Sequence, residues 1–189
     1  TTAGQFNMPE DLAVRLPAGA QVVFQVHYVN PTDQPLLVRD VVNIEFAPDP
    51  EKVTPAAPWG TTTLDFSAPA LETYSAGYTC PVEKEMNLFL GFGHMHGYGK
   101  AITIEVGNPE NMKEVYNVDS WDVSYRDEPP LVQWSKQDPM TLSPGDQIRV
   151  QCTWQNSSDH ALGFPEEMCA ALFWFFPSTD AVVCAGEPI

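Results

Sequence analysis

Two of the four histidines in this sequence are separated by a single residue, in His94-Met95-His96. Apolar residues alternate just before them, which predicts a strand over residues 87–96. Residues i and i+2 of a strand project from the same face. Two imidazoles placed in this way can bind one metal ion, so the pair predicts a metal site. The alternative interpretation is two unrelated strand histidines.

A metal site of this kind needs a third ligand, and the sequence offers hard and soft candidates. Glu166 and Glu167 are acidic candidates, and Met168 follows them at the entrance to the most apolar segment. A thioether with two imidazoles is a soft, low-charge set that suits copper, particularly Cu(I), better than zinc or calcium. Spacing alone does not select Met168, because a single methionine is usually a core-filling residue.

The charge balance excludes several classes of partner. Asp and Glu number 25 against 9 Lys and Arg, which gives a formal net charge of −16. A surface this acidic repels phosphate backbones, so we expect no nucleic-acid partner. No apolar run approaches the roughly 18 residues that a spanning helix needs, so no transmembrane segment is predicted.

The sequence predicts that short strands position the candidate ligands. The 18 prolines are spread along the chain and disfavour long helices. Turn signals separate alternating segments, and this pattern predicts an all-β fold, an antiparallel two-sheet sandwich that is jelly-roll-like. We expect one domain over residues 1–189, in which about residues 1–16 form an N-terminal arm or linker. The nearly continuous apolar stretch 168–176 is typical of a strand buried on both faces. The expected strands are 22–29, 36–46, 61–66, 87–96, 101–106, 115–125, 147–154 and 168–176, and the expected long loop is 48–60.

Four cysteines are scattered along the chain, and none lies in a C-x-x-C pair. An even number in an acidic, Pro-rich chain predicts two disulfides and a secreted or periplasmic location. Three pairings are open, and spacing does not choose among them. The chain opens on Thr1 without a start Met, so we expect a mature, processed or excised product.

Several motifs together carry a family resemblance. Residues 94–100 read H-M-H-G-Y-G-K, residues 167–169 read E-M-C, and residues 25–28 read Q-V-H-Y. Residues 144–146 and 150–152 add a P-G-D turn and a strand that ends in cysteine. In this order, over about residues 17 to 184, they resemble the C-terminal, catalytic-copper domain of the copper type II ascorbate-dependent monooxygenases. That family includes peptidylglycine α-hydroxylating monooxygenase and dopamine β-monooxygenase.

The resemblance implies one copper per chain, held by His94, His96 and Met168, at the place where O2 and substrate meet. It implies a catalytic role for these three residues in hydroxylating a substrate C–H bond, with ascorbate or another reductant. It also implies a jelly-roll-like sandwich and a disulfide pattern, Cys80 with Cys184 and Cys152 with Cys169.

The family's second copper is held mainly by an N-terminal domain, with one histidine from the Q-V-H-Y strand, at His27 here. The sequence contains no counterpart of that domain. We therefore expect an N-terminal copper domain elsewhere in the full protein or on a partner chain, or else loss of the second site. The alternative function is a non-catalytic copper-binding or structural subunit of a larger extracellular or periplasmic assembly.

The substrate anchors of the peptide-amidating members also differ in this chain. Phe92, Ala170 and Leu172 stand where those enzymes have an arginine, an asparagine and a tyrosine. A peptide carboxylate would meet no cation there, and burying it unpaired is costly. We therefore expect an apolar or aromatic substrate that contacts these three residues, with Tyr98 as a further contact.

Overall fold

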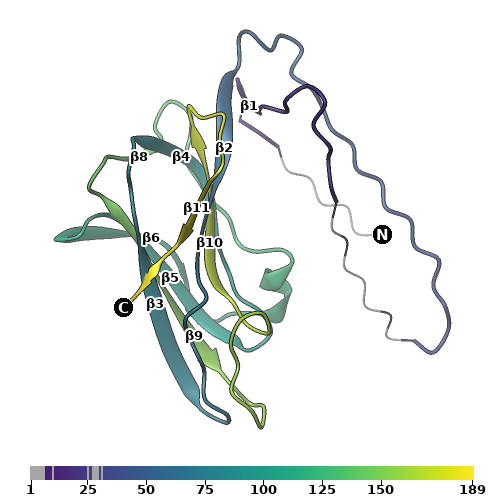
Figure 1. Ribbon diagram of the computed structural model, residues 1–189, viewed down its shortest axis with the longest axis vertical. Helices are drawn as coiled ribbons and strands as arrows, with labels where there is room; N and C mark the ends of the chain where they lie inside the picture. Colours follow the sequence, from purple (N-terminus) through teal and green to yellow (C-terminus); the bar gives the residue numbers. More distant parts are fainter. Residues whose placement is uncertain (1–6, 10, 25, 27–29, 31) are drawn as a thin grey trace.

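The computed structural model describes residues 7–9, 11–24, 26, 30 and 32–189, and its strands form two packed sheets (Figure 1). One sheet has the order β1 (Leu12–Val14), β2 (Thr54–Thr63), β10 (Cys169–Phe176), β4 (Met86–His94) and β7 (Val132–Gln133). In this sheet β11 (Val182–Ala185) also pairs with β2, and β8 (Met140–Leu142) with β4. The other sheet has the order β12 (Glu187–Pro188), β3 (Thr73–Pro81), β9 (Gln147–Gln155), β5 (Gly99–Asn108) and β6 (Asn111–Val118).

These two sheets confirm the predicted all-β sandwich. Their strands pair antiparallel, except that β1 and β11 run parallel to β2. The helical structure in the described part of the chain is one 3-10 turn, Val123–Arg126. None of the described residues forms a helix long and apolar enough to cross a membrane.

The core lies between the inner faces of the sheets and follows the period-2 pattern of the strands. Alternate residues of β9 and β10 are buried and meet there, with Trp154 and Phe173 among the largest. Ala170, Leu172 and Trp174 alternate with them in β10 and are only half-buried. The prediction that this strand is buried on both faces is therefore wrong, because its outer face lines a cavity.

Both disulfides that the resemblance implied are present, and both join the two sheets. Cys80 of β3 is bonded to Cys184 of β11 across 104 residues of sequence. Cys152 of β9 is bonded to Cys169, the first residue of β10, across 17 residues. The second bridge anchors the strand that begins directly after Met168.

We expect the two bridges to differ in their contribution to stability. A disulfide restricts the unfolded chain more when it closes a longer loop, by about 3 kcal/mol for a loop like that of Cys152–Cys169 and about 4.7 kcal/mol for one like that of Cys80–Cys184. Urea unfolding of the two paired Cys→Ala variants measures both losses. Equal losses, or a larger loss for the shorter loop, would show that native contacts at the bridges outweigh the chain constraint.

The predicted strand 36–46 is wrong, and the predicted strand 22–29 is not seen at its described residues, 22–24 and 26, while its other residues lie outside the described part of the chain. The described residues of both segments form no strand, and apolar side chains such as Val23, Leu37 and Phe46 are exposed. Figure 1 shows the described residues between β1 and β2 extending away from the sandwich. An alternating pattern gives a strand only where a neighbouring strand takes up its backbone hydrogen bonds, and neither sheet of the sandwich does so here.

The predicted long loop 48–60 is also partly wrong, because β2 begins at Thr54. The prolines in this stretch suggested a loop, since proline donates no ladder hydrogen bond. Pro58 is tolerated because it lies in a gap along one edge of β2. Pairing with β1 ends at Ala56, and pairing with β11 starts at Trp59.

Candidate metal centre

The two histidines of the H-x-H pair lie at the end of β4. His94 is the last residue of the strand, Met95 is fully buried, and His96 follows half-buried in the turn. The alternation of the strand therefore continues one step beyond its end. The two imidazole rings lie with their centroids 5.1 Å apart and nearly perpendicular, at 85°.

Met168 lies near the end of β4, directly before the first residue of the neighbouring strand β10. β10 runs antiparallel to β4, with Ala170 in register with His94, so Met168 comes just before this pair. Met168 and His94 line one cavity. In the described part of the chain, no three His, Cys, Asp or Glu side chains gather into a metal-binding group. A set of two imidazoles and a thioether, the one expected from the sequence, is of the kind that suits copper.

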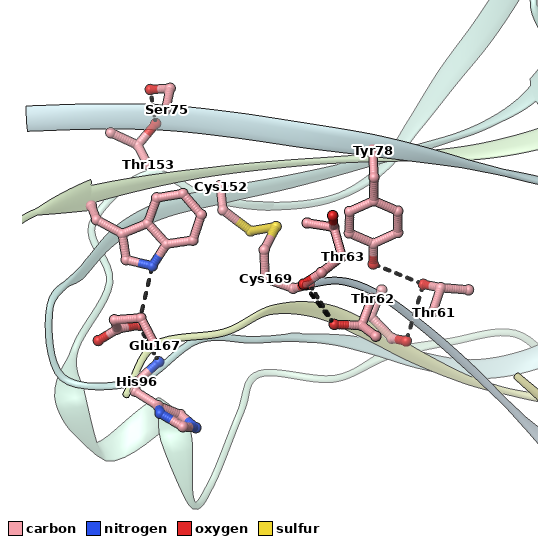
Figure 2. The surroundings of a disulfide bond; sticks show 12 residues. Thr61, Thr62, Thr63, Ser75, Tyr78, His96, Cys152, Thr153, Glu167 and Cys169 are labelled. Atoms are coloured by element: carbon pink, nitrogen blue, oxygen red, sulfur yellow. Dashed lines mark hydrogen bonds between the residues drawn. A yellow bond between two sulfur atoms is a disulfide. The ribbon is translucent and has the colours of Figure 1, made fainter. Parts of the chain in front are cut away.

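Glu167 holds the turn that contains His96 against the start of β10. Sequence reasoning missed this role, because it named Glu167 only as a candidate acidic ligand. Its carboxylate is fully buried and accepts hydrogen bonds from the backbone N–H of His96 at 3.0 Å and of Tyr98 at 2.6 Å. The indole Nε1–H of Trp154 donates to it at 3.1 Å. Figure 2 shows Glu167 between His96 and the Cys152–Cys169 disulfide. The E-M-C motif was the available signal for this residue.

The turn around His96 is fixed by further hydrogen bonds. The ring Nδ1 of His96 lies 2.9 Å from the backbone carbonyl oxygen of Glu166. A proton on Nδ1 donates to that oxygen and leaves Nε2 with a free lone pair, the arrangement usual for a metal-binding histidine. The indole of Trp121 donates to the carbonyl oxygen of His96 at 3.1 Å. A side chain at Gly99 would clash with this indole, since its Cβ would lie 2.8 Å from Trp121 Cδ1.

Burial lowers the pKa of His94 and neighbouring carboxylates raise the pKa of His160, so these two histidines differ in protonation. Burial, followed by the neighbouring His96, holds the pKa of His94 below its usual value, which favours the neutral imidazole that binds metals. Exposed His160 contacts Asp159 at 3.1 Å and Glu166 at 3.3 Å, and these carboxylates raise its pKa.

We expect the two histidines to titrate in a fixed order in metal-free protein. His94 should titrate below pH 6.5 and His160 above it. Two-dimensional NMR of the imidazole signals measures both midpoints. The Glu166→Gln variant should lower the midpoint of His160, because one of its two carboxylate partners is removed. An inverted order would contradict the arrangement of carboxylates and burial described above.

An apolar cavity of about 350 Å³ opens beside His94 and Met168. Phe92, Ala170 and Leu172, three of the four expected substrate contacts, line it. Tyr98 does not line it and instead packs against the core. His27 lies outside the described residues. Sequence reasoning missed the opposite wall, which comes from residues 60–62 of β2 and from Val183 of β11. Nothing local signals this wall, because it depends on strand pairing over more than 100 residues.

Comparison with known proteins identifies a family for this chain, whereas the similarity to a solved structure is remote. A search of curated proteins found no match to this sequence. A solved structure described as "Structure of infectious bursal disease virus Gx strain" is similar over 77% of this chain and 39% of that chain, at 9% identity and a TM-score of 0.27. The chain thus spans less than half of that structure's length, and the likeness is too remote to inform on function. Residues 61–187 match the family described as copper type II ascorbate-dependent monooxygenase, C-terminal domain. Since this match covers most of the chain and includes the H-x-H and E-M-C motifs, the protein belongs to the copper type II ascorbate-dependent monooxygenases, through their C-terminal domain.

Proposed function

We propose that this domain binds one copper through His94, His96 and Met168 and serves as the substrate-side copper domain of a monooxygenase. The proposal is supported by two observations: the His94 and His96 rings lie with their centroids 5.1 Å apart, and His94 lines an apolar cavity together with Met168. Bound copper supplies the redox chemistry with O2. One oxygen atom enters a substrate C–H bond and the other leaves as water, with two electrons and two protons from ascorbate or another reductant.

The protein's own residues would position the copper ligands and shield the site from water. Glu167 and the carbonyl oxygen of Glu166 orient the His96 turn, and the Cys152–Cys169 bridge fixes the strand that follows Met168. Phe92 and Leu172 present apolar surface beside the ligands, which excludes water and favours a substrate without charge. The proposed substrate is therefore apolar or aromatic.

A partner domain is part of the proposal, because the domain is the C-terminal half of a two-domain family. We assign to that partner the contact with residues 15–53, whose described apolar side chains, including Val23, Phe24 and Leu37, lie exposed. Burying such side chains is favourable by about 25 cal/mol per Å² of apolar surface. His27 would then complete a second copper site with histidines of the partner domain. The two disulfides and the family indicate an extracellular or secretory protein, and we propose a secreted or periplasmic location.

Copper stoichiometry of the reconstituted full chain tests the proposal. We expect one copper per chain, with copper–sulfur scattering in the X-ray absorption spectrum of the reduced form. His94→Ala and His96→Ala should each lose the metal, whereas His160→Ala, on an exposed loop, should retain it. Near-zero copper, or copper indifferent to both substitutions, would overturn the site. Copper binding without ascorbate-dependent O2 consumption, even with an N-terminal copper domain added, would favour a non-catalytic copper-binding subunit.

A further inference from the structure

The cavity beside the candidate metal centre has a wall whose role none of the motifs explains. β10 lies between β4 and β2, so the outer face of the sheet brings Phe92, Leu172 and Gly60 into one row. The register pairs Leu172 with both Phe92 and Gly60. Val183 of β11 pairs with Gly60 on the far side and completes the wall.

Gly60 keeps this space open. A Cβ built at Gly60 would lie 3.6 Å from Leu172 Cδ1, an ordinary contact, and it would meet no other atom within 4 Å. A larger side chain therefore fits the backbone at this position and would extend over the surface that lines the cavity. No close backbone approach requires glycine here, so its effect is to leave room beside Leu172.

The wall is held rigidly. β11 runs parallel to β2 over Val182–Ala185 and is tied to the other sheet by the Cys80–Cys184 bridge. The backbone N–H of Gly186 donates to the carbonyl oxygen of Thr62 at 2.8 Å, directly after the strand. A preformed wall of this kind favours small-molecule binding, because little conformational entropy is lost when a ligand enters.

The chemistry of the lining is apolar. Of the residues that line the cavity, His94 is the single titratable one, and neither Lys, Arg, Asp nor Glu is among them. The remaining side chains are aliphatic, aromatic, thioether or threonine hydroxyl groups. The volume of about 350 Å³ lies within the range of small-ligand pockets, and an apolar cavity of about 150 Å³ already holds benzene.

We propose that this cavity binds a neutral aromatic or aliphatic small molecule of one or two rings, and that Gly60 sets the upper limit of its size. The inference rests on the proposed function for its biological meaning, because the bound molecule would be the substrate. Binding itself requires no copper. A charged carboxylate is rejected, because it would lose its water and find no cation in the lining.

Isothermal titration of the copper-free full chain with toluene, indole and benzoate tests the proposal. Toluene and indole should bind, and benzoate should bind at least about 10-fold more weakly. Gly60→Leu should weaken indole more than toluene, by about 10-fold or more, and leave copper stoichiometry unchanged. Val183→Lys, which adds a cation at the exposed rim, should strengthen benzoate binding. Ser75→Leu, on the outer face of the other sheet, is the matched control and should change none of these values.

Five results separate the outcomes. Benzoate binding equal to that of toluene, or affinities unaffected by Gly60→Leu, would overturn the proposal. Toluene affinity that falls as protein concentration rises would also overturn it, because a second copy of the chain would then cover the cavity. Toluene binding to a chain that takes up no copper would support the pocket and contradict the proposed function. Copper uptake without toluene binding would support the copper site of the proposed function and overturn the proposed pocket.

Discussion

The Met168→Leu variant should lose at least about 100-fold in Cu(I) affinity while its fold is retained. Leu conserves the volume and apolar character of Met, so the packing at the start of β10 changes little. The thioether is the soft ligand that distinguishes a copper site from a pair of imidazoles. Changes to residues that merely support a metal ligand cost about 10- to 100-fold in affinity, so loss of a ligand should exceed that range.

Competition against a chromophoric Cu(I) chelator measures this loss in the full chain. Met140→Leu is the matched control, because Met140 is also half-buried but lies on β8, remote from the histidine turn. The control should retain wild-type affinity. If Met168→Leu retained it as well, the third ligand would have to come from another group, and the E-M-C motif would act here through Glu167 and Cys169 alone.

The Glu167→Ala variant should be less stable than the wild type by at least about 3 kcal/mol. Three donors, the backbone N–H groups of His96 and Tyr98 and the indole of Trp154, point at the buried carboxylate. Each buried donor left without a partner costs about 1–3 kcal/mol. Glu167→Gln should also be destabilised, because its amide NH2 would face N–H donors and a single oxygen is left to accept.

Urea unfolding of the copper-free chain measures these losses, and Cu(I) competition measures their consequence for the metal. We expect both Glu167 variants to bind copper about 10- to 100-fold more weakly, because the His96 turn is no longer held in place. Glu166→Gln is the neighbouring control, since its side chain is exposed, and its stability should change by less than about 0.5 kcal/mol. Full stability in Glu167→Gln would show that the network tolerates a neutral acceptor.

Local sequence carried the information for the candidate metal ligands and for part of the strands, but not for β3, which no predicted strand covers. The alternation that predicted strands at 87–96, 101–106 and 147–154 appears as β4, β5 and β9. These predictions succeed because the side-chain direction of a strand depends on the residue itself and its neighbours two positions away. The types of the candidate ligands, two imidazoles and a thioether, are likewise visible without any fold.

Long-range packing decided the rest. Spacing left three disulfide pairings open, and the correct one followed from the family resemblance before the structure confirmed it. The segment 36–46 alternates as β4 does, and 22–29 is β-branched and aromatic, yet the described residues of both form no strand, because no neighbouring strand pairs with them.

Glu167 shows most clearly the division between sequence and tertiary structure. Its sequence marks it as an acid beside Met168, and that position made it one of the acidic candidates for a metal ligand. The structure instead surrounds the carboxylate with N–H donors from β9 and from the histidine turn, both remote in sequence. The residue types of the candidate metal site are therefore local properties of this chain. The use of each carboxylate and the shape of the apolar cavity depend on which strands the fold places side by side.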